Sequence, residues 1–489
     1  MCGIVALWGA SNTELVDRML SKIRHRGPDG QETVRLPNGT GTLGHQRLAI
    51  IDPANGRQPM HSPDGRQSLI VNGMIYNYRS LRSKLGDAGF TTDSDSETIL
   101  HGYRTWGRDV VTRLDGMFAF ALSDDERIIA ARDPLGIKPL YFGQVGDATA
   151  FASEIQALDG LADDISEFPA GHIYDSRSGF ERYYTIPGSA GEYWSTGETL
   201  EAVRSTLEAA VRKRLRSDVP LGCFLSGGLD SSLIAAIARQ DIDELHTFSV
   251  GLDGSTDLDA AREVAVHLGT IHHERVLTQA EAINAMPEVV RHLESYDRDL
   301  VRNAVPTWFV AREAASADMK VILTGEGADE IFAGYGYYED YASDPRSLQR
   351  ELRRSLESLH DMNLQRVDRM TMAHGIEARV PFLDTAMVDV GMRVDPQLKQ
   401  SAPHGRRIEK WVLRKSCEDL LPAPILWREK EQFADGSGFG SLFGELSSGP
   451  TFDGRTEESY YRDVLAAHFQ DAKSLDLTTH WRDNRLAVA

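Results

Sequence analysis

The sequence predicts an α+β N-terminal domain followed by an α/β C-terminal domain. Its 489 residues exceed the length that a single hydrophobic core normally supports. In the first 185 residues, short apolar runs alternate with Gly, Pro, Asn and Asp turns, which is typical of packed antiparallel sheets. After residue 200, strands alternate with helices, which is typical of a parallel sheet covered on both faces.

The first part of the chain, residues 1–185, is the predicted α+β domain. Its apolar, β-prone runs are predicted strands, and helices are predicted between them. The strands are expected at residues 2–8, 68–72, 117–123 and 149–153, and the helices near residues 14–24, 76–88 and 96–106. Residues 186–199, which are rich in Gly, Ser and Thr, are the predicted linker.

The second part, residues 200–489, is the predicted α/β domain. Its predicted helices are residues 200–215, 231–240 and 259–268, and its predicted strands are residues 220–225, 245–251 and 321–324. Beyond about residue 330 the pattern is mostly helical, and the last forty residues carry no recognisable motif.

Charge and cysteine content exclude several classes of protein. The chain has 53 Lys and Arg against 73 Asp and Glu, and a net charge of −20 is a poor match for nucleic-acid phosphates. Its three cysteines form neither a zinc motif nor a disulfide framework, which suits a cytoplasmic protein. We expect no signal peptide and no membrane partner. The sequence leaves the oligomeric state open, and a homodimer is one candidate.

A Ser-Gly-Gly-Leu-Asp-Ser loop at residues 226–231 joins a predicted strand to a predicted helix. Its two glycines let the backbone approach a bulky anion, and the N–H groups at the helix start point toward that anion. Asp230 is unusual beside an anion unless it holds a cation, so it is a candidate Mg²⁺ ligand. The alternative is a Gly-rich turn that only caps a helix, which explains the strand–loop–helix context less well.

A second acidic segment, Thr324-Gly325-Glu326-Gly327-Ala328-Asp329-Glu330, follows a later predicted strand. Carboxylates at the carboxyl end of a parallel strand lie on the ligand-binding edge of the sheet. We therefore expect Asp329 to share a metal with Asp230 and Glu326 to face the same cavity. Taken alone, the segment is better explained as a helix start rich in acids. Together with the Ser-Gly-Gly-Leu-Asp-Ser loop, the ligand-binding explanation is favoured.

Two basic residues, Lys430 and Arg379, are the candidates to balance the charge of a triphosphate. The sequence patterns around them do not distinguish them from ordinary surface residues. Their selection depends on the family resemblance described below.

Cys2 is the candidate nucleophile of the first domain. If the initiator methionine is removed, the free α-amino group, with an unperturbed pKa of about 7.7–8.0, can accept the thiol proton. Attack on a carboxamide would release ammonia, and Asn72 and Gly73 offer N–H donors for the oxyanion. For a glutamine substrate, Arg47 can bind the α-carboxylate and Asp95 the α-ammonium. Each residue has an ordinary structural explanation, so only the combination indicates glutamine hydrolysis.

Together these motifs resemble the glutamine-hydrolysing asparagine synthetases of the bacterial B type. The resemblance runs from residue 1 to about residue 438 and includes MCGIVALWG, RHRGPDG, LGHQRLAI, VNGMIYN, SDVPLGCFLSGGLDSS, LTGEGADEIFAGY, EARVPFLD and WREKEQF. It implies an Ntn-type glutaminase sandwich followed by a parallel-sheet domain of the adenine nucleotide α-hydrolase type. It also implies that aspartate, ATP, glutamine and water give asparagine, AMP, pyrophosphate and glutamate, with ammonia passing through an internal tunnel.

The resemblance assigns roles to individual positions. Cys2, Asn72, Gly73, Glu326 and Lys430 would be the catalytic residues. Glutamine would contact Arg47, Leu48, Ala49, Ile50, Ile51, Asn72, Gly73, Met74 and Asp95. ATP would contact Phe224, Leu225, Ser226, Gly227, Gly228, Asp230, Ser231, Val250, Thr324 and Gly325, and Mg²⁺ would be held by Asp230 and Asp329.

The acceptor segment departs from the family pattern. Where the family commonly has two threonines, this chain has Asp299 and Leu300. The predicted acceptor pocket consists of these two residues with Arg302 and Arg379. A new acid at this place would repel an acidic acceptor or bind a cationic part of a different one. Met74 replaces a common Glu, which is compatible with glutaminase activity.

Four functions are compatible with these motifs. The first is asparagine synthesis from aspartate, ATP and glutamine. The second is amidation of a different carboxylic acid, which the change at Asp299 and Leu300 favours. The third is intramolecular ring closure of the β-lactam synthetase type, which needs no ammonia and therefore no Cys2 site. The fourth is a non-enzymatic binding or regulatory protein, which two complete motif sets disfavour.

Overall fold

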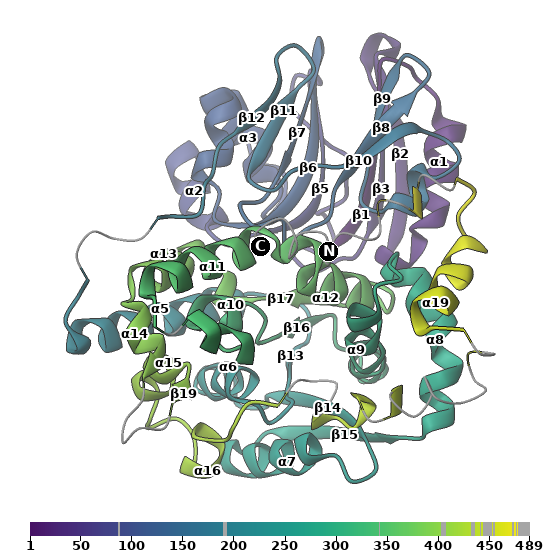
Figure 1. The fold of residues 1–489 in the computed structure, drawn as a ribbon. Coiled ribbons are helices and arrows are strands. Elements are labelled where there is room, and N and C mark those ends of the chain that lie inside the picture. Colours follow the sequence, from purple (N-terminus) through teal and green to yellow (C-terminus); the bar gives the residue numbers. More distant parts are fainter. Residues whose placement is uncertain are drawn as a thin grey trace.

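The computed structural model describes residues 1–86, 89–188, 193–341, 343–401, 407–431, 436–440, 442–443, 452, 455–471, 474–475 and 477, and of Asn38 only the backbone. Residues 189–192 of the predicted linker, residues 87–88 of a predicted helix, residues 432–433 of the WREKEQF motif and residues 478–489 therefore lie outside the described residues. The described chain forms two lobes stacked on each other (Figure 1).

The N-terminal lobe is a sandwich of two antiparallel sheets, with the orders β10-β8-β9-β1-β3-β2 and β12-β11-β7-β6-β5-β4. The strands are β1 (Cys2–Trp8), β2 (Gly30–Arg35), β3 (Gly41–Arg47), β4 (Met60–His61), β5 (Gln67–Ile75), β6 (Gly116–Asp124), β7 (Arg127–Arg132), β8 (Tyr141–Val145), β9 (Ala148–Ala152), β10 (Asp163–Glu167), β11 (His172–Asp175) and β12 (Gly179–Arg182). The helices are α1 (Thr13–Lys22), α2 (Tyr78–Leu85), α3 (Glu97–Trp106) and α4 (Ile155–Leu158).

The facing sides of the two sheets form the core of this lobe. Ile4 of β1 belongs to the same buried cluster as Ile70 of β5, because alternate side chains of each strand point between the sheets. Within its own sheet, β1 pairs with β3 so that Cys2 lies opposite Arg47. The sandwich therefore brings the start of β1 close to Asn72, which lies in β5 of the other sheet.

The C-terminal lobe is built on a parallel sheet with the order β15-β14-β13-β16-β17. Its strands are β13 (Leu221–Phe224), β14 (His246–Leu252), β15 (Ile271–Leu277), β16 (Val321–Leu323) and β17 (Glu377–Arg379), and a small hairpin pairs β18 (Gln400–Ser401) with β19 (Ile408–Glu409). The helices are α5 (Thr196–Arg214), α6 (Leu229–Arg239), α7 (Thr256–Leu268), α8 (Gln279–Leu293), α9 (Arg298–Ser316), α10 (Ala328–Phe332), α11 (Pro345–Glu357), α12 (Asn363–Met372), α13 (Thr385–Arg393), α14 (Pro396–Lys399), α15 (Trp411–Ser416), α16 (Ala423–Leu426) and α19 (Glu457–Ala466).

Helices cover both faces of the parallel sheet. Apolar residues of α5, α6 and α7 form one cluster with Val321 and Leu323 of β16. Ile322 of the same strand points the other way, into a cluster with α8 and α9. This arrangement leaves the carboxyl ends of the strands as the open edge at which ligands bind.

The predicted fold class is confirmed in both lobes, and most element boundaries agree within a few residues. The main difference is the start of α5, which is Thr196 and not residue 200. Ser195 and Glu198 form a capping box there, in which each side chain hydrogen-bonds to the backbone of the other residue. None of the described helices combines the length and the apolar composition that crossing a membrane requires.

Candidate functional site

The first candidate site surrounds Cys2 at the start of β1. The backbone N–H of Cys2 donates to Asn72 Oδ1 over 3.0 Å, and its thiol lies 3.9 Å from the carbonyl oxygen of Leu48. Burial raises the pKa of the Cys2 thiol, and the nearby terminal ammonium opposes this effect. Asn72 Nδ2 is buried and has no hydrogen-bond partner among the described residues. A buried unpaired donor beside a thiol is suited to an oxyanion that forms only during reaction.

The pocket next to Cys2 gathers the residues predicted for glutamine binding. Its lining includes Arg47, Leu48, Ala49, Ile50, Ile51, Gly73, Met74 and Asp95, with Asn72 directly behind Cys2. Sequence reasoning missed Gly56, Gln58, Ser94 and Ser96, which also line it and carry no distinctive motif. The cavity measures only about 30 Å³, because Met1 is buried in it.

Asp95 and Arg47 differ in burial and in their hydrogen-bond partners in this pocket. Burial raises the pKa of Asp95 to about 6, although its Oδ2 accepts a hydrogen bond from the Ile75 N–H over 2.7 Å. Arg47 is half-buried and donates to the carbonyl oxygen of Asp52 over 3.0 Å. A cationic group placed beside Asp95 would favour its ionised form, as expected for a site that holds an α-ammonium.

Glu377 of the C-terminal lobe completes this pocket. Its Oε2 lies 3.0 Å from the Met1 ammonium and its Oε1 accepts from Arg379 Nε over 2.6 Å. Burial disfavours the charge of Glu377, but the terminal ammonium and Arg379 lower its pKa to about 2. The prediction that Arg379 lies in the acceptor pocket is therefore wrong. Its buried guanidinium binds Glu377 and the carbonyls of Arg214 and Arg216 between the lobes, because β17 ends there.

The second candidate site is a cavity of about 1150 Å³ at the carboxyl ends of the parallel strands. Of the residues predicted to bind ATP, it is lined by Phe224, Leu225, Ser226, Gly228, Asp230, Ser231, Val250, Thr324 and Gly325. Within the loop, Ser226 N–H donates to Ser231 Oγ over 3.2 Å. Gly227 differs from the prediction, because it lies against Ala260 and Ala261 of α7 and not in the cavity lining.

Two carboxylates in this cavity are bridged by lysines. Lys410 Nζ lies 2.5 Å from Asp230 Oδ2 and 2.6 Å from Asp329 Oδ1, and Lys430 Nζ lies 2.6 Å from Asp329 Oδ2. Burial opposes ionisation of Asp329, but the two lysines outweigh it and lower its pKa. Sequence reasoning missed Lys410, which starts α15 and belongs to no motif that we interpreted.

The donor set fits Mg²⁺. Asp230 and Asp329 face the same cation, Lys410 Nζ, so both carboxylates already converge on one position. The other oxygen of Asp230, Oδ1, is buried and accepts no hydrogen bond within the described part of the chain. Carboxylate oxygens of this kind are the ligands that Mg²⁺ prefers in nucleotide sites.

Comparisons with known proteins match both lobes. A glutamine amidotransferase domain model matches residues 1–177, and an asparagine synthase model matches residues 202–347 and 341–473. Asparagine synthetase [glutamine-hydrolyzing] of Triphysaria versicolor is 40% identical over 98% of this chain and 88% of its own length. The chain belongs to the glutamine-hydrolysing asparagine synthetase family. Asparagine synthetase 3 of Arabidopsis thaliana is 43% identical over 91% of this chain and 80% of its own length, and the Asparagus officinalis protein is 42% identical over 91% and 79%.

In this member of the asparagine synthetase family, Glu326 is paired with an arginine. Arg366 Nη2 donates to Glu326 Oε1 over 2.7 Å, and Arg366 Nη1 donates to Thr307 Oγ1 over 2.9 Å. All three residues line the second cavity. Glu326 is thus held by an ion pair at the wall of this cavity, and no sequence motif identified Arg366 as its partner.

The predicted acceptor segment of this asparagine synthetase family member also lines the second cavity. Asp299, Leu300 and Arg302 lie at the start of α9 and all contribute to the lining. Arg302 is not free, because Nε donates to Glu457 Oε2 of α19 over 3.0 Å and Nη2 contacts the other oxygen. Asp299 pairs with Arg298 over 3.1 Å. The charges of Asp299 and Arg302 at the cavity wall are therefore each balanced by an ion pair with another protein side chain.

Proposed function

We propose that this chain is an ATP-dependent ligase that makes asparagine from aspartate with glutamine as the nitrogen donor. The observation that supports the proposal is that most of the predicted site residues line two cavities in a member of the asparagine synthetase family, one beside Cys2 and one beside the Ser-Gly-Gly-Leu-Asp-Ser loop. We assign glutamine hydrolysis to residues 1–185, a linker role to residues 186–199, and synthesis to residues 200–489. Three free cysteines support a cytoplasmic location.

In the proposed glutaminase reaction, removal of Met1 frees the α-amino group of Cys2 as the base. Cys2 Sγ attacks the side-chain carbonyl of glutamine, and the thiol proton passes by way of the α-amine to the nitrogen that leaves as ammonia. Water then hydrolyses the thioester to glutamate. Asn72 Nδ2, which is buried and unpaired among the described residues, is suited to donate to the oxyanion. Gly73 is the second proposed donor.

In the proposed synthetase reaction, a carboxylate oxygen of aspartate attacks the α-phosphorus of ATP, and pyrophosphate leaves. Ammonia then attacks the acyl carbon, and AMP leaves as the amide forms. Lys430 would hold the phosphates, and Glu326 would act on the reacting carboxylate. Asp230 and Asp329 would hold Mg²⁺, which would neutralise charge on the departing pyrophosphate.

A second candidate is amidation of a different carboxylic acid in specialised metabolism. Two features of the predicted acceptor segment favour it. Asp299 and Leu300 line the cavity, and Arg302 forms an ion pair with Glu457. An arginine that is already paired with a carboxylate offers less attraction to a second acidic group of the acceptor. Ring closure and a non-enzymatic role receive no such support.

The deciding experiment is an acceptor screen with the full chain, ATP, Mg²⁺ and glutamine. We expect AMP and an amide with the mass of asparagine only when aspartate is present. Omission of glutamine, with ammonium chloride added instead, should restore the product if the two sites act in sequence. Glutamate release without any asparagine, together with AMP formation from another acid, would instead establish the second candidate.

A further inference from the structure

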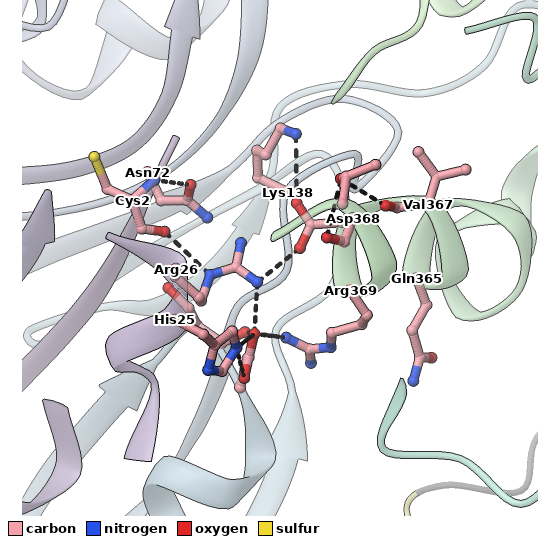
Figure 2. A network of polar contacts seen from close by, with 12 residues as sticks. Cys2, His25, Arg26, Asn72, Lys138, Gln365, Val367, Asp368 and Arg369 are labelled. Atoms are coloured by element: carbon pink, nitrogen blue, oxygen red, sulfur yellow. Dashed lines mark hydrogen bonds and ion pairs between the residues drawn. The ribbon is translucent and has the colours of Figure 1, made fainter. Parts of the chain in front are cut away.

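Arg26 lies at the centre of a buried polar network between the two lobes (Figure 2). It is fully buried, and its Nε donates to the backbone carbonyl of Cys2 over 3.1 Å. Its Nη1 donates to Asp368 Oδ2 over 2.8 Å and to Glu154 Oε1 over 2.6 Å. Glu154 belongs to the N-terminal lobe, whereas Asp368 belongs to α12 of the C-terminal lobe. Arg26 therefore connects a carboxylate of the C-terminal lobe to the backbone of the proposed nucleophile by hydrogen bonds.

Asp368 is ionised in this setting. Burial disfavours its charge, but Arg26 and Lys138 outweigh this effect and hold the pKa of Asp368 below its ordinary value. Lys138 Nζ lies 3.4 Å from the other oxygen, Oδ1, so the side chain is anchored on both sides. Without Asp368, Arg26 would keep only Glu154 of these two carboxylates and Lys138 would lose its ion pair, which would displace the charged groups that remain.

Helix α12 contacts both candidate sites. Arg366 points toward Glu326 in the nucleotide cavity, whereas Asp368, two residues later, points toward Arg26. Residues two apart on an α-helix differ by about 200° in direction, so they lie on opposite sides of the helix axis. A disturbance of α12 as a whole would therefore affect both reactions, whereas loss of the Asp368 side chain alone should affect only the Cys2 side.

We propose that Asp368 is a positioning residue for the glutaminase reaction, acting through Arg26 on the backbone of Cys2. The Cys2 backbone has two polar anchors, the Asn72 oxygen at its N–H and Arg26 Nε at its carbonyl. These anchors set where Sγ lies relative to the oxyanion donors, and small misplacements of a reacting atom cost large factors in rate. This inference rests on the proposed function, because it assumes that Cys2 hydrolyses glutamine.

The test compares Asp368→Ala with wild type in two assays on the full chain. We expect the glutaminase kcat to fall by about 10-fold to 100-fold, the range for losing a charge-assisted hydrogen bond, with the KM for glutamine nearly unchanged. Ammonia-dependent amide synthesis should stay at the wild-type rate. Asp368→Asn, which keeps an oxygen acceptor for Arg26, should recover most of the glutaminase kcat.

The matched control is Asp115→Asn, which removes a different ion pair between the lobes, from Asp115 Oδ2 to Lys213 Nζ over 2.6 Å. It should leave the glutaminase kcat at the wild-type value. An unchanged kcat in Asp368→Ala, an equal fall in the control, a parallel loss of ammonia-dependent synthesis, or no recovery in Asp368→Asn would each overturn the proposal. A wild-type chain that hydrolyses glutamine but makes no asparagine would contradict the proposed function and leave this inference standing.

Discussion

At the scale of single residues, the surroundings of each buried acid decide its protonation. Burial raises the pKa of Asp95 to about 6, and burial together with Asp329 raises that of Glu330 to about 7. Glu377 is equally buried, yet the terminal ammonium and Arg379 lower its pKa to about 2. Similar buried carboxyl groups in one molecule thus ionise over different pH ranges.

His45 gives a residue-scale prediction about stability and pH. Burial lowers its pKa from 6.5 to about 3, so below pH 6.5 the unfolded chain binds a proton that the folded protein does not. The contribution of His45 to stability is therefore complete above pH 6.5 and is lost as the pH falls toward 3. Below pH 6 the unfolding free energy of His45→Gln should depend less on pH than that of wild type, by up to about 1.4 kcal/mol per pH unit.

Denaturant titrations of both proteins at several pH values between 5 and 7.5 measure this difference. His61→Gln is the control, because His61 is exposed on β4 and its ring hydrogen-bonds to Ser68 of the paired strand β5. Its pH dependence should match that of wild type. Identical slopes for wild type and His45→Gln would show that His45 does not resist protonation in the fold.

At the scale of elements, the nucleotide loop depends on the close contact between Gly227 and α7. Gly227 has a φ of +73°, and a Cβ there would lie 2.5 Å from the Ala261 nitrogen and 2.6 Å from the Ala260 carbonyl carbon. The loop glycines thus have separate functions. Gly228 lines the cavity, whereas Gly227 lets the loop pass over the start of a neighbouring helix.

Gly227→Ala should therefore disturb the loop and its helix together. We expect destabilisation of about 2 kcal/mol or more and a strong loss of ammonia-dependent synthesis, since both strain and overlap act there. The control is Gly254→Ala, which has a similar φ of +78° but no atom within 4 Å of its added Cβ. Its free energy of unfolding should fall only by the amount that the strained backbone conformation costs. Equal effects of the two substitutions would mean that the contact with α7 is unimportant.

At the scale of the whole molecule, the start of the chain lies where the two lobes meet (Figure 1). The Met1 ammonium is paired with Glu377 of the C-terminal lobe, and Arg26 is paired with Asp368. The pocket beside Cys2 has a lining from both lobes, because Glu377 contributes to it, although each lobe also has a core cluster of its own. Docking of the lobes is therefore a condition for a complete lining of this pocket.

Replacing Cys2 should separate the two reactions. Cys2→Ala removes the proposed nucleophile, so we expect glutamate release and glutamine-dependent synthesis to fall by at least about 10³-fold. Synthesis from added ammonium should persist near the wild-type rate, because the second cavity is unchanged. The readouts are glutamate, AMP and amide product with each nitrogen source.

Cys417→Ala is the matched control, since Cys417 is also a buried free thiol but lies in the C-terminal lobe. It should retain synthesis with both nitrogen sources. Persistent glutamine-dependent synthesis in Cys2→Ala would contradict the assignment of the nucleophile.

The sequence by itself determined the fold class, the family and most of the predicted residues that line the two cavities. Short continuous apolar runs predict strands such as β1. Gly-rich or acidic motifs contiguous in the chain, such as residues 226–231 and 324–330, indicate a ligand site without knowledge of distant residues. The one clear boundary error is the start of α5 at Thr196, where the capping box of Ser195 and Glu198 begins the helix. These features depend on residues close together in the chain, which is why they can be predicted from it.

Only the tertiary structure decided which distant residues meet. It placed Arg379 between the lobes and not in the acceptor pocket, and it brought Lys410 between Asp230 and Asp329. It also placed Glu377 in the glutamine pocket and Asp368 behind Arg26. These contacts join residues separated by more than 80 positions, and a single charged residue in a sequence does not reveal its partner. The physical reason is that burial and charge pairing arise from tertiary packing within and between the lobes, which no local pattern encodes.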